Sequence, residues 1–346
     1  MQFIKSDIDI NFVGAKKIAF TISLALVFIS IISLVVHKGP KYGVDFSGGS
    51  SIQIKFDKSV KVEDVKKGLE TLKIEKASVQ RFGLDTDNEF QVRTNKSFMS
   101  DTDTDFTQKL KRTIGDATGA AVLDVSLDMV GPQVSQDLRK KALLAMFYAL
   151  LFIAIYISGR FEQKWEMSAL MAAIIGGGVY FIGQFLNAGT PGLILIALIG
   201  SLLFCWFFEL KFAMGAIVAL IHDVSVTVGI FSLMNIEFTL PIIAALLTII
   251  GYSLNDTIIV YDRIRENSKK ANKEDMESVI NKSINETLSR TILTSLTTLI
   301  VVIALYVLGG GVIHHFAFAM IIGVLVGTYS SIFVASPILL AWQVKK

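Results

Sequence analysis

Long apolar runs recur along this chain, and they restrict its possible folds more than any other feature. A helix that crosses a bilayer needs about 20 mostly apolar residues, because the hydrocarbon core offers no hydrogen-bond partner to the backbone. Candidate segments of about this length are residues 18–36, 142–159, 167–186, 191–208, 212–233, 239–261, 291–308 and 313–341. The sequence therefore predicts a polytopic α-helical membrane protein with about eight spans embedded in a lipid bilayer.

The distribution of charge divides the chain into parts. Only 18% of the 346 residues are charged, whereas a typical soluble domain has about 25%. The charged residues gather in 38–140, which predicts a polar domain there, between a first segment 1–37 with one span and a helix bundle 141–346. The net charge of +3 is too small for a nucleic-acid-binding face, so nucleic acid is not expected as a partner.

Lys and Arg residues set the predicted orientation, because cytoplasmic loops are enriched in them. With the N-terminus in the cytoplasm, Lys16, Lys17, Arg160 and the basic loop 262–290 all lie inside, and the three short outer turns carry no Lys or Arg. Arg139 and its two lysine neighbours break the pattern, but they end a long translocated domain, for which the rule is weak. The polar domain is therefore expected outside the cytoplasm.

Residue periodicity predicts the fold of this outer domain. Strand patterns alternate with helix patterns in the order β-α-β-β-α-β, at residues 50–56, 60–72, 77–82, 89–94, 101–114 and 121–130. This order is typical of a small ferredoxin-like α+β domain. Two roles remain open for it. It could be a scaffold that positions neighbouring chains, or a docking surface for an extended polypeptide, for example by strand addition at a sheet edge.

Several motifs occur in a fixed order along the chain. They are Tyr42–Gly49 (YGVDFSGG) after the first span, Val130–Pro132 (VGP), His222–Val224 (HDV), Ile250–Thr257 (IGYSLNDT) followed by Tyr261–Asn267 (YDRIREN), and Leu288–Thr291 (LSRT). Together they resemble the SecD/SecF family, and the stretch from Ile250 onward is similar to its SecF branch. The resemblance covers the whole chain except for one apparent insertion.

The resemblance implies a function. SecD and SecF form an auxiliary complex of the SecYEG channel in the bacterial inner membrane, with YajC and YidC as further associated proteins. The complex uses the proton gradient to promote preprotein translocation, and it belongs to the RND superfamily of proton-driven pumps. A small-molecule efflux half-transporter of that superfamily and a passive scaffold of the translocase are the alternatives. The chain shows no G-x-x-x-x-G-K-[ST] nucleotide-binding loop. No enzyme activity, cofactor or metal site is expected, and the energy source would be the proton gradient.

Ionisable residues inside predicted spans are functional candidates, because a charge in the bilayer costs several kcal/mol. Asp223 and Asp256 lie within apolar runs, and Arg290 stands at the start of the seventh span. By resemblance, Asp256 and Arg290 match the aspartate and arginine that serve proton transport in SecF, and Asp223 is a further candidate. The alternatives are helix-packing hydrogen bonds for the carboxylates and an interfacial position for Arg290. An aspartyl protease is disfavoured, because Asn255 precedes Asp256 where such enzymes have glycine.

Two other motifs supply candidate residues. The first is predicted to be a hinge, or else an ordinary turn, between the outer domain and the first span; its residues are Gly43, Asp45, Phe46, Gly48 and Gly49. The second is a motif at the start of the cytoplasmic loop, made of Asp262, Arg263, Arg265, Glu266 and Asn267. Residues 274–290 of this loop have one apolar face, which predicts an amphipathic helix lying flat on the membrane surface.

One feature departs from the family pattern, in which six spans are usual. Phe161–Leu170 resembles Phe208–Ile217, with Phe, Glu, Lys, Met and Ala at matching places and an offset of 47 residues. Residues 167–208 are therefore predicted to be an inserted or duplicated helical hairpin, with chance recurrence as the alternative. Two added spans leave the orientation of all later segments unchanged.

Overall fold

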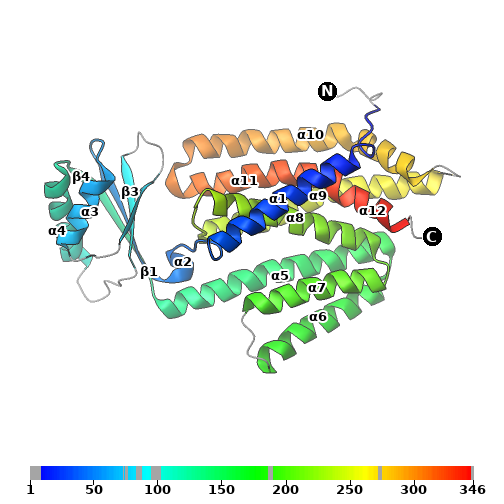
Figure 1. The fold of residues 1–346 in the computed structure, drawn as a ribbon, viewed down its shortest axis with the longest axis horizontal. Helices are drawn as coiled ribbons and strands as arrows, with labels where there is room; N and C mark the ends of the chain where they lie inside the picture. The colour runs from blue at the N-terminus through cyan, green and yellow to red at the C-terminus, as the bar shows by residue number, and fades with distance from the viewer. Residues whose placement is uncertain are drawn as a thin grey trace.

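The computed structural model describes residues 9–72, 74, 77–82, 88–94, 103–185, 190–271 and 275–343. A small sheet domain stands at one end of a long helical bundle, and both chain termini lie toward the other end (Figure 1). This arrangement follows from the sequence pattern, because the polar segment cannot share the apolar surroundings that the long helices require.

The outer domain has the predicted ferredoxin-like order. Its elements are β1 (Gly49–Phe56), α3 (Val62–Thr71), β2 (Ser78–Phe82), β3 (Glu89–Thr94), α4 (Asp103–Thr118) and β4 (Val122–Val130). The sheet order is β2-β3-β1-β4, and each strand is antiparallel to its neighbours. The expected β-α-β-β-α-β fold is confirmed.

Alternation along the strands gives the sheet two different faces. Ile52, Ile54 and Val92 are fully buried beneath α3 and α4, where Leu69 and Leu110 complete the core. Both helices lie on the side of the sheet that faces away from the bundle (Figure 1). The residues between the buried ones therefore point toward the membrane helices, and they are polar.

The bundle is built from long helices. They are α1 (Lys16–Val36), α5 (Pro132–Glu162), α6 (Trp165–Phe185), α7 (Thr190–Phe207), α8 (Lys211–Leu233), α9 (Leu240–Lys270), α10 (Met276–Leu308) and α11 (Gly310–Ser330), which continues through a π-helical turn (Ser331–Ala335) into α12 (Ser336–Gln343). All eight predicted spans are therefore helical. In the described ranges, six helices are long and apolar enough to cross a membrane, whereas α6 and α7 contribute shorter apolar stretches, Trp165–Val179 and Gly192–Phe207.

These two shorter helices are the predicted hairpin, and they lie beside α5 at the edge of the bundle (Figure 1). The similar turns before α6 and before α8 each contain a left-handed residue, Gln163 (φ 57°) and Glu209 (φ 53°). Lys164 Nζ donates to the Phe208 carbonyl at 2.8 Å, and the Phe212 amide donates to Glu162 Oε1 at 2.9 Å. The two turns therefore cap one another. That the hairpin is an insertion stays a prediction.

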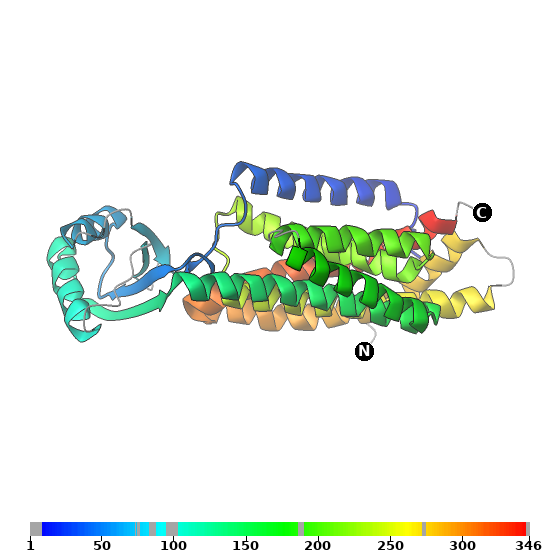
Figure 2. The same cartoon turned by 90° about the horizontal axis from the view of Figure 1, so that it is seen from below.

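The first helix, α1, runs along the flank of the bundle and contacts α8 (Figure 2). At the contact, Gly229 of α8 lies directly against Ser30 of α1, and a Cβ atom at Gly229 would overlap the serine. Near the outer end of the same pair, the hydroxyls of Ser33 and Ser232 are 2.8 Å apart. Small residues and hydroxyl pairs are the usual means of joining helices in lipid.

The first part of α10, which the sequence predicts to be an amphipathic helix on the membrane surface, differs from the prediction. The apolar face expected to rest on the membrane surface is buried by protein, since Ile280, Ile284 and Leu288 join Val13 and Ile264 in one core cluster. This part of α10 also continues into the span without a break. The surface location is therefore wrong, because the N-terminal segment and α9 supply the apolar partner that the sequence pattern assigns to lipid.

Backbone hydrogen bonds fix the N-terminal segment on this part of α10. The Phe12 amide donates to Asn281 Oδ1 at 2.8 Å, and the Ile10 amide donates to Asn285 Oδ1 at 3.0 Å. Asn285 Nδ2 donates back to the Ile10 carbonyl at 2.9 Å. Residues 9–15, before the first span, are thus part of the folded end of the bundle opposite the sheet domain.

The contact between α1 and α8 is testable with two glycines. We expect Gly229→Ala to lower the stability of the detergent-solubilised protein by about 1–3 kcal/mol through overpacking. Gly251→Ala is the matched control, because the structure describes no atom within 4 Å of a Cβ there, and alanine is the better helix former. Thermal unfolding followed by size-exclusion chromatography would measure both. Equal stability of the two variants would contradict the described contact.

Candidate functional site

The carboxylate of Asp223 sits in the middle of the bundle with its hydrogen-bonding capacity used. Its side chain is fully buried on α8. Oδ2 accepts hydrogen bonds from Ser253 Oγ at 2.5 Å and Ser330 Oγ at 2.7 Å, and Oδ1 lies 2.9 Å from His222 Nδ1. Because Ser253 belongs to α9 and Ser330 to α11, this one side chain ties three helices together.

Glycines allow these three helices to approach. A Cβ at Gly323 would overlap Ile249 of α9, and one at Gly327 would lie 2.9 Å from Ser253 Cβ. The π-helical turn follows directly after Ser330, and the carbonyl of its last residue, Ala335, accepts a hydrogen bond from the Tyr261 hydroxyl at 3.1 Å. Such turns are frequent at functional sites in helices.

A line of hydroxyls extends this polar cluster to α1. The Tyr329 ring lies beside His222, with 6.2 Å between ring centroids. Its hydroxyl donates to the Ala19 carbonyl at 2.7 Å and accepts from Ser23 Oγ at 3.1 Å. In the part of the chain that the structure describes, His222 Nε2 is buried without a hydrogen-bond partner.

The second intramembrane carboxylate, Asp256, differs from Asp223 because it lacks hydrogen-bond partners in the described structure. Asp256 is one turn beyond Ser253 on α9, and its side chain is 1% exposed. Among the described residues, neither of its carboxylate oxygens has a hydrogen-bond partner that meets geometric criteria. A buried carboxylate without fixed donors is chemically able to gain and lose a proton, because neither state is held by a specific contact.

The polar groups that face Asp256 come from α10. They are the guanidinium of Arg290, which acts on the carboxylate through its charge, and the hydroxyl of Ser295. Ser295 Oγ is close to Asp256, but it pairs at 2.6 Å with Thr328 Oγ1 of α11. Arg290 thus influences Asp256 through its charge from an exposed position on the neighbouring helix, and no ion pair joins the two in the described structure. Asp223 lies in a separate cluster of hydrogen bonds. The part of these three residues in proton transport stays a prediction.

The glycine motif before β1 forms a joint between the outer domain and the bundle. The Gly43 amide donates to the Phe238 carbonyl at 2.8 Å, and Asp45 Oδ2 accepts from the Leu240 amide at 2.9 Å, which caps the first turn of α9. Gly48 (φ 75°) and Gly49 (φ 114°) adopt backbone angles that favour glycine, and they lead the chain into β1.

The remaining motif residue, Phe46, belongs to α2 (Val44–Ser47) and is buried beneath it. The helix α2 packs against the start of α5, so the motif touches both α5 and α9. Motion at this joint, as the hinge interpretation requires, stays a prediction.

A second connection between the two parts is ionic. Glu237, in the turn between α8 and α9, pairs with Arg93 of β3 and with Lys41 at 3.2 Å. Burial lowers the pKa of Arg93 to about 10, although the Asp45 carboxylate raises it. The guanidinium therefore stays charged at neutral pH. Removing one partner of a buried pair is costly, about 3–5 kcal/mol, so this contact holds the sheet over the bundle.

The motif Asp262–Asn267, predicted to begin a cytoplasmic loop, lies within α9 and not in a loop. Arg160 of α5 pairs with Asp262 at 3.3 Å, and Arg265 Nη1 donates to the Arg160 carbonyl at 2.9 Å. Arg263 pairs with Glu266 at 2.8 Å, one turn along the same helix, which supports its extension beyond the span.

The same motif also reaches α10. Glu286 is paired with Arg263 Nε at 3.0 Å, and it accepts from Asn267 Nδ2 at 2.8 Å. These contacts join α5, α9 and α10 at the end of the bundle opposite the sheet domain, so the motif has a structural role that the sequence pattern does not indicate.

Several site residues escape sequence reasoning. The hydroxyls of Ser253, Ser330 and Ser295 become recognisable only when three helices are placed side by side. The pair of Arg93 and Glu237 joins residues 144 positions apart in the chain, so no local pattern indicates it. Polar alternation in β1 and β3 was the available signal for the residues facing the bundle.

The contrast between the two carboxylates predicts different costs of removal. Asp223→Ala leaves Ser253 Oγ and His222 Nδ1 without their present partner, at about 1–3 kcal/mol each, while Ser330 Oγ keeps its hydrogen bond to the Gly327 carbonyl. A large loss of thermal stability in detergent is therefore expected. Asp256→Ala, the matched variant on the neighbouring helix, removes no hydrogen bond and is expected to cost clearly less. If both variants melted at the same temperature, the described hydrogen bonds of Asp223 would be contradicted.

Comparisons with known proteins agree with the geometry. The profile described as protein export membrane protein SecD/SecF, C-terminal, matches residues 106–185 and 178–345, and the SecD/SecF GG motif matches residues 33–60. The protein translocase subunit SecF of Calditerrivibrio nitroreducens is 39% identical over 344 residues, covering 97% of this chain and 95% of its own. The SecF of Vibrio alginolyticus is 36% identical over 345 residues, covering 100% of this chain and 93% of its own.

Solved structures lead to the same family. The crystal structure of SecDF, a translocon-associated membrane protein from Thermus, superposes with a TM-score of 0.72 at 31% identity, covering 99% of this chain. A crystal structure of SecDF in a super-membrane-facing form gives a TM-score of 0.57 at 31% identity, covering 98% of this chain and 39% of that one. The chain spans 40% of the length of the first SecDF chain. By sequence and by fold, the chain belongs to the SecD/SecF family of protein-export membrane proteins.

Proposed function

We propose that the chain is a SecF-like auxiliary subunit of the Sec protein-export machinery. It assembles with a SecD-like subunit at the SecYEG channel, with YajC and YidC as further neighbours, and it uses the proton gradient to promote preprotein translocation. The role requires no covalent step, so we propose that the chain is not an enzyme.

The observation that carries the energetic part of this proposal is the state of Asp256. It is a buried carboxylate inside a membrane span, it has no fixed hydrogen bond among the described residues, and the charge of Arg290 acts on it. Protonation from one side and release to the other would change the charge between α9 and α10. A ligand or proton shifts a conformational equilibrium only by favouring one state over another, and this charge change supplies such a difference.

The helix α9 connects that site to the outer domain. It has 31 residues and a length of about 46 Å. Its first amide is capped by Asp45 of the glycine motif, and its last turns are tied to α5 and α10. A movement of α9 at Asp256 would therefore displace the contacts between α9 and the glycine motif beneath the sheet domain.

We further propose that the protein lies in the bacterial inner membrane, with its N-terminus in the cytoplasm and the domain 38–140 in the periplasm. The distribution of Lys and Arg supports this orientation. The bundle supports it too, because the sheet domain and both termini lie at opposite ends (Figure 1).

Two alternatives make different predictions about Asp256. A passive scaffold of the translocase has no use for a buried carboxylate that lacks hydrogen bonds. A small-molecule efflux half-transporter uses protons but would confer drug resistance, and membership of the SecD/SecF family favours export. Proton-dependent export therefore distinguishes the leading proposal from both.

The central test replaces the carboxylate. In membrane vesicles that export a precursor, Asp256→Asn is expected to remove the increase that the proton gradient gives, so that export falls to the level of vesicles lacking the protein. The physical reason is that an amide cannot carry the proton. Asp256→Glu keeps a carboxylate and should retain part of the increase.

Asp137→Asn provides the control, because Asp137 is an exposed carboxylate on α5 paired with Lys141 at 2.8 Å. It should leave gradient-dependent export intact. If the Asp256→Asn protein were present in normal amount and showed the same gradient-dependent increase in export as the wild type, the proton role would be refuted. Family membership would be unaffected.

The orientation is tested by cysteine labelling. Cys205, the single cysteine of the chain, is buried and is replaced by alanine. In this background, Asp116→Cys on α4 should react with a membrane-impermeant maleimide added to intact spheroplasts. Lys282→Cys on α10 should react only after the membrane is opened. The reverse pattern would show that the domain faces the cytoplasm.

A further inference from the structure

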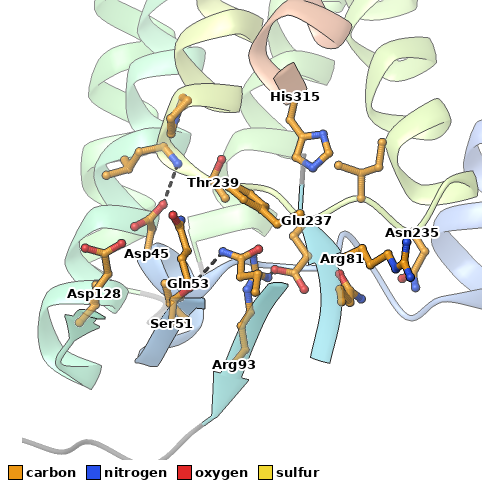
Figure 3. Close-up of a pocket in the computed structure, with 18 of the residues that line it drawn as sticks. Asp45, Ser51, Gln53, Arg81, Arg93, Asp128, Asn235, Glu237, Thr239 and His315 are labelled. Carbon is orange, nitrogen blue, oxygen red and sulfur yellow. Dashed lines mark hydrogen bonds and ion pairs between the residues drawn. The ribbon is translucent and has the colours of Figure 1, made fainter. Parts of the chain in front are cut away.

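The face of the sheet that α3 and α4 leave uncovered borders a cavity of about 750 Å³. The cavity lies between this face and the outer end of the bundle, as Figure 3 shows, with Ser51, Gln53 and Arg93 on the sheet side and Glu237, Thr239 and His315 on the bundle side. Its volume is within the range of pockets that bind ligands of several hundred daltons.

A row of glutamines crosses this face. Gln80 of β2 stands opposite Gln91 of β3, and Gln91 stands opposite Gln53 of β1. Because directly paired residues project from the same side of a sheet, the three carboxamides lie side by side at about 4.8 Å intervals. All three line the cavity. A parallel row contains Arg93, Ser51 and Asp128.

The hydrogen-bonding capacity of this row is only partly used. Gln91 donates to Ser51 Oγ at 3.0 Å and accepts from Arg93 Nη2 at 3.0 Å. Within the described ranges, the carboxamides of Gln53 and Gln80 have no hydrogen-bond partner in the protein. Each carboxamide offers two N–H donors and one carbonyl acceptor, so the row presents both kinds of group to the cavity.

The charges around the cavity disfavour an anionic occupant. Its lining includes two arginines, Arg81 and Arg93, and three carboxylates, Asp45, Asp128 and Glu237. Arg93 is already paired with Glu237. Glu237 is also paired with Lys41, so the charges around the cavity balance. A phosphate or lipid headgroup would therefore meet no excess of positive charge, whereas a neutral ligand with amide groups would meet matching donors and acceptors.

We propose that this cavity binds a short stretch of extended polypeptide through its backbone, with the glutamine row as the recognition element. Side-chain amides carry the same donor and acceptor as a peptide group, so such a site holds a chain without reading its sequence. The proposal rests on the export function above, and it makes the occupant the exported precursor. It places the contact on the sheet face, whereas the sequence pattern suggests an edge.

Three contacts between the outer domain and the bundle surround the cavity. The main-chain bond between Gly43 and Phe238 lies on one side, and the Arg93 pair lies on another. At a third point, Phe82 of β2 packs directly on Gly311, where a Cβ atom would overlap the ring. A chain held between these contacts would be clamped between the outer domain and the membrane surface.

Photo-crosslinking in the full protein tests the site. A benzophenone amino acid is placed at position 53 or 80, and membranes containing the Sec partners export a precursor under an energised gradient. Adducts with the precursor are expected at both positions, at least five-fold above those at the control position 116. Asp116 is exposed on α4, on the opposite side of the same domain. Two precursors of unrelated sequence should give the same pattern.

Adducts only with lipid or with another Sec subunit would overturn the proposal, as would equal precursor adducts at all three positions. The double variant Gln53→Leu/Gln80→Leu should lower export at least three-fold, and Gln53→Asn/Gln80→Asn, which keeps the amides, should lower it less. Protease resistance of the domain must be unchanged in both pairs. Equal export by the two pairs would also overturn it.

The same assay separates this proposal from the proton role. In the Asp256→Asn background, precursor adducts at position 53 should persist, because binding and energy use depend on different residues. Loss of gradient dependence without any precursor adduct would leave the export function standing and remove only the glutamine site. Precursor adducts in the Asp256→Asn background together with an unaffected gradient response would keep the glutamine site and remove the proton role of Asp256.

Discussion

Hydrocarbon cannot hydrogen-bond, and the bundle must therefore satisfy its polar side chains from within. Asp223 shows how fully this can be done: two serines and a histidine on three helices meet one carboxylate. The close packing of α8, α9 and α11 depends on that meeting point. A second carboxylate, Asp256, lies on α9 one turn beyond Ser253, and in the described structure it has no hydrogen-bond partner.

The two carboxylates are thus suited to different roles, Asp223 to stabilising the bundle and Asp256 to carrying a proton. A saturated acceptor is expensive to disturb, so Asp223 is suited to holding helices in place. An acceptor without fixed donors changes its protonation more readily, and it lies on the helix whose first turn is capped by Asp45. The glycine motif therefore contacts the first turn of α9, and the intramembrane site lies near the middle of the same helix, although the motif itself precedes that helix by almost 200 residues.

Much of the architecture can be predicted from the sequence, because the spacing of apolar residues and the length of apolar runs indicate which residues are buried. The apolar runs predict every long helix, and alternation in strands such as Ser50–Phe56 predicts the ferredoxin-like order. The pattern cannot say which apolar partner covers a face, so the helix carrying Ile280 and Ile284 is wrongly assigned to lipid when protein covers it. The row of Gln53, Gln80 and Gln91 depends on strand register, which a single strand does not contain.

The π-helical turn at Ser331–Ala335 has a consequence for how the chain tolerates change in length. Such a turn holds one residue more than an α-helical turn of equal span, and each residue rotates the helix by about 100°. The side chains after Ala335 therefore face a different direction from those before Ser331. Deleting one residue here would keep the helix continuous but rotate its C-terminal part about the helix axis. This rotation would separate the Tyr261 hydroxyl from the Ala335 carbonyl to which it donates. An insertion or deletion of one residue in this helix therefore rotates all the side chains that follow it about the helix axis.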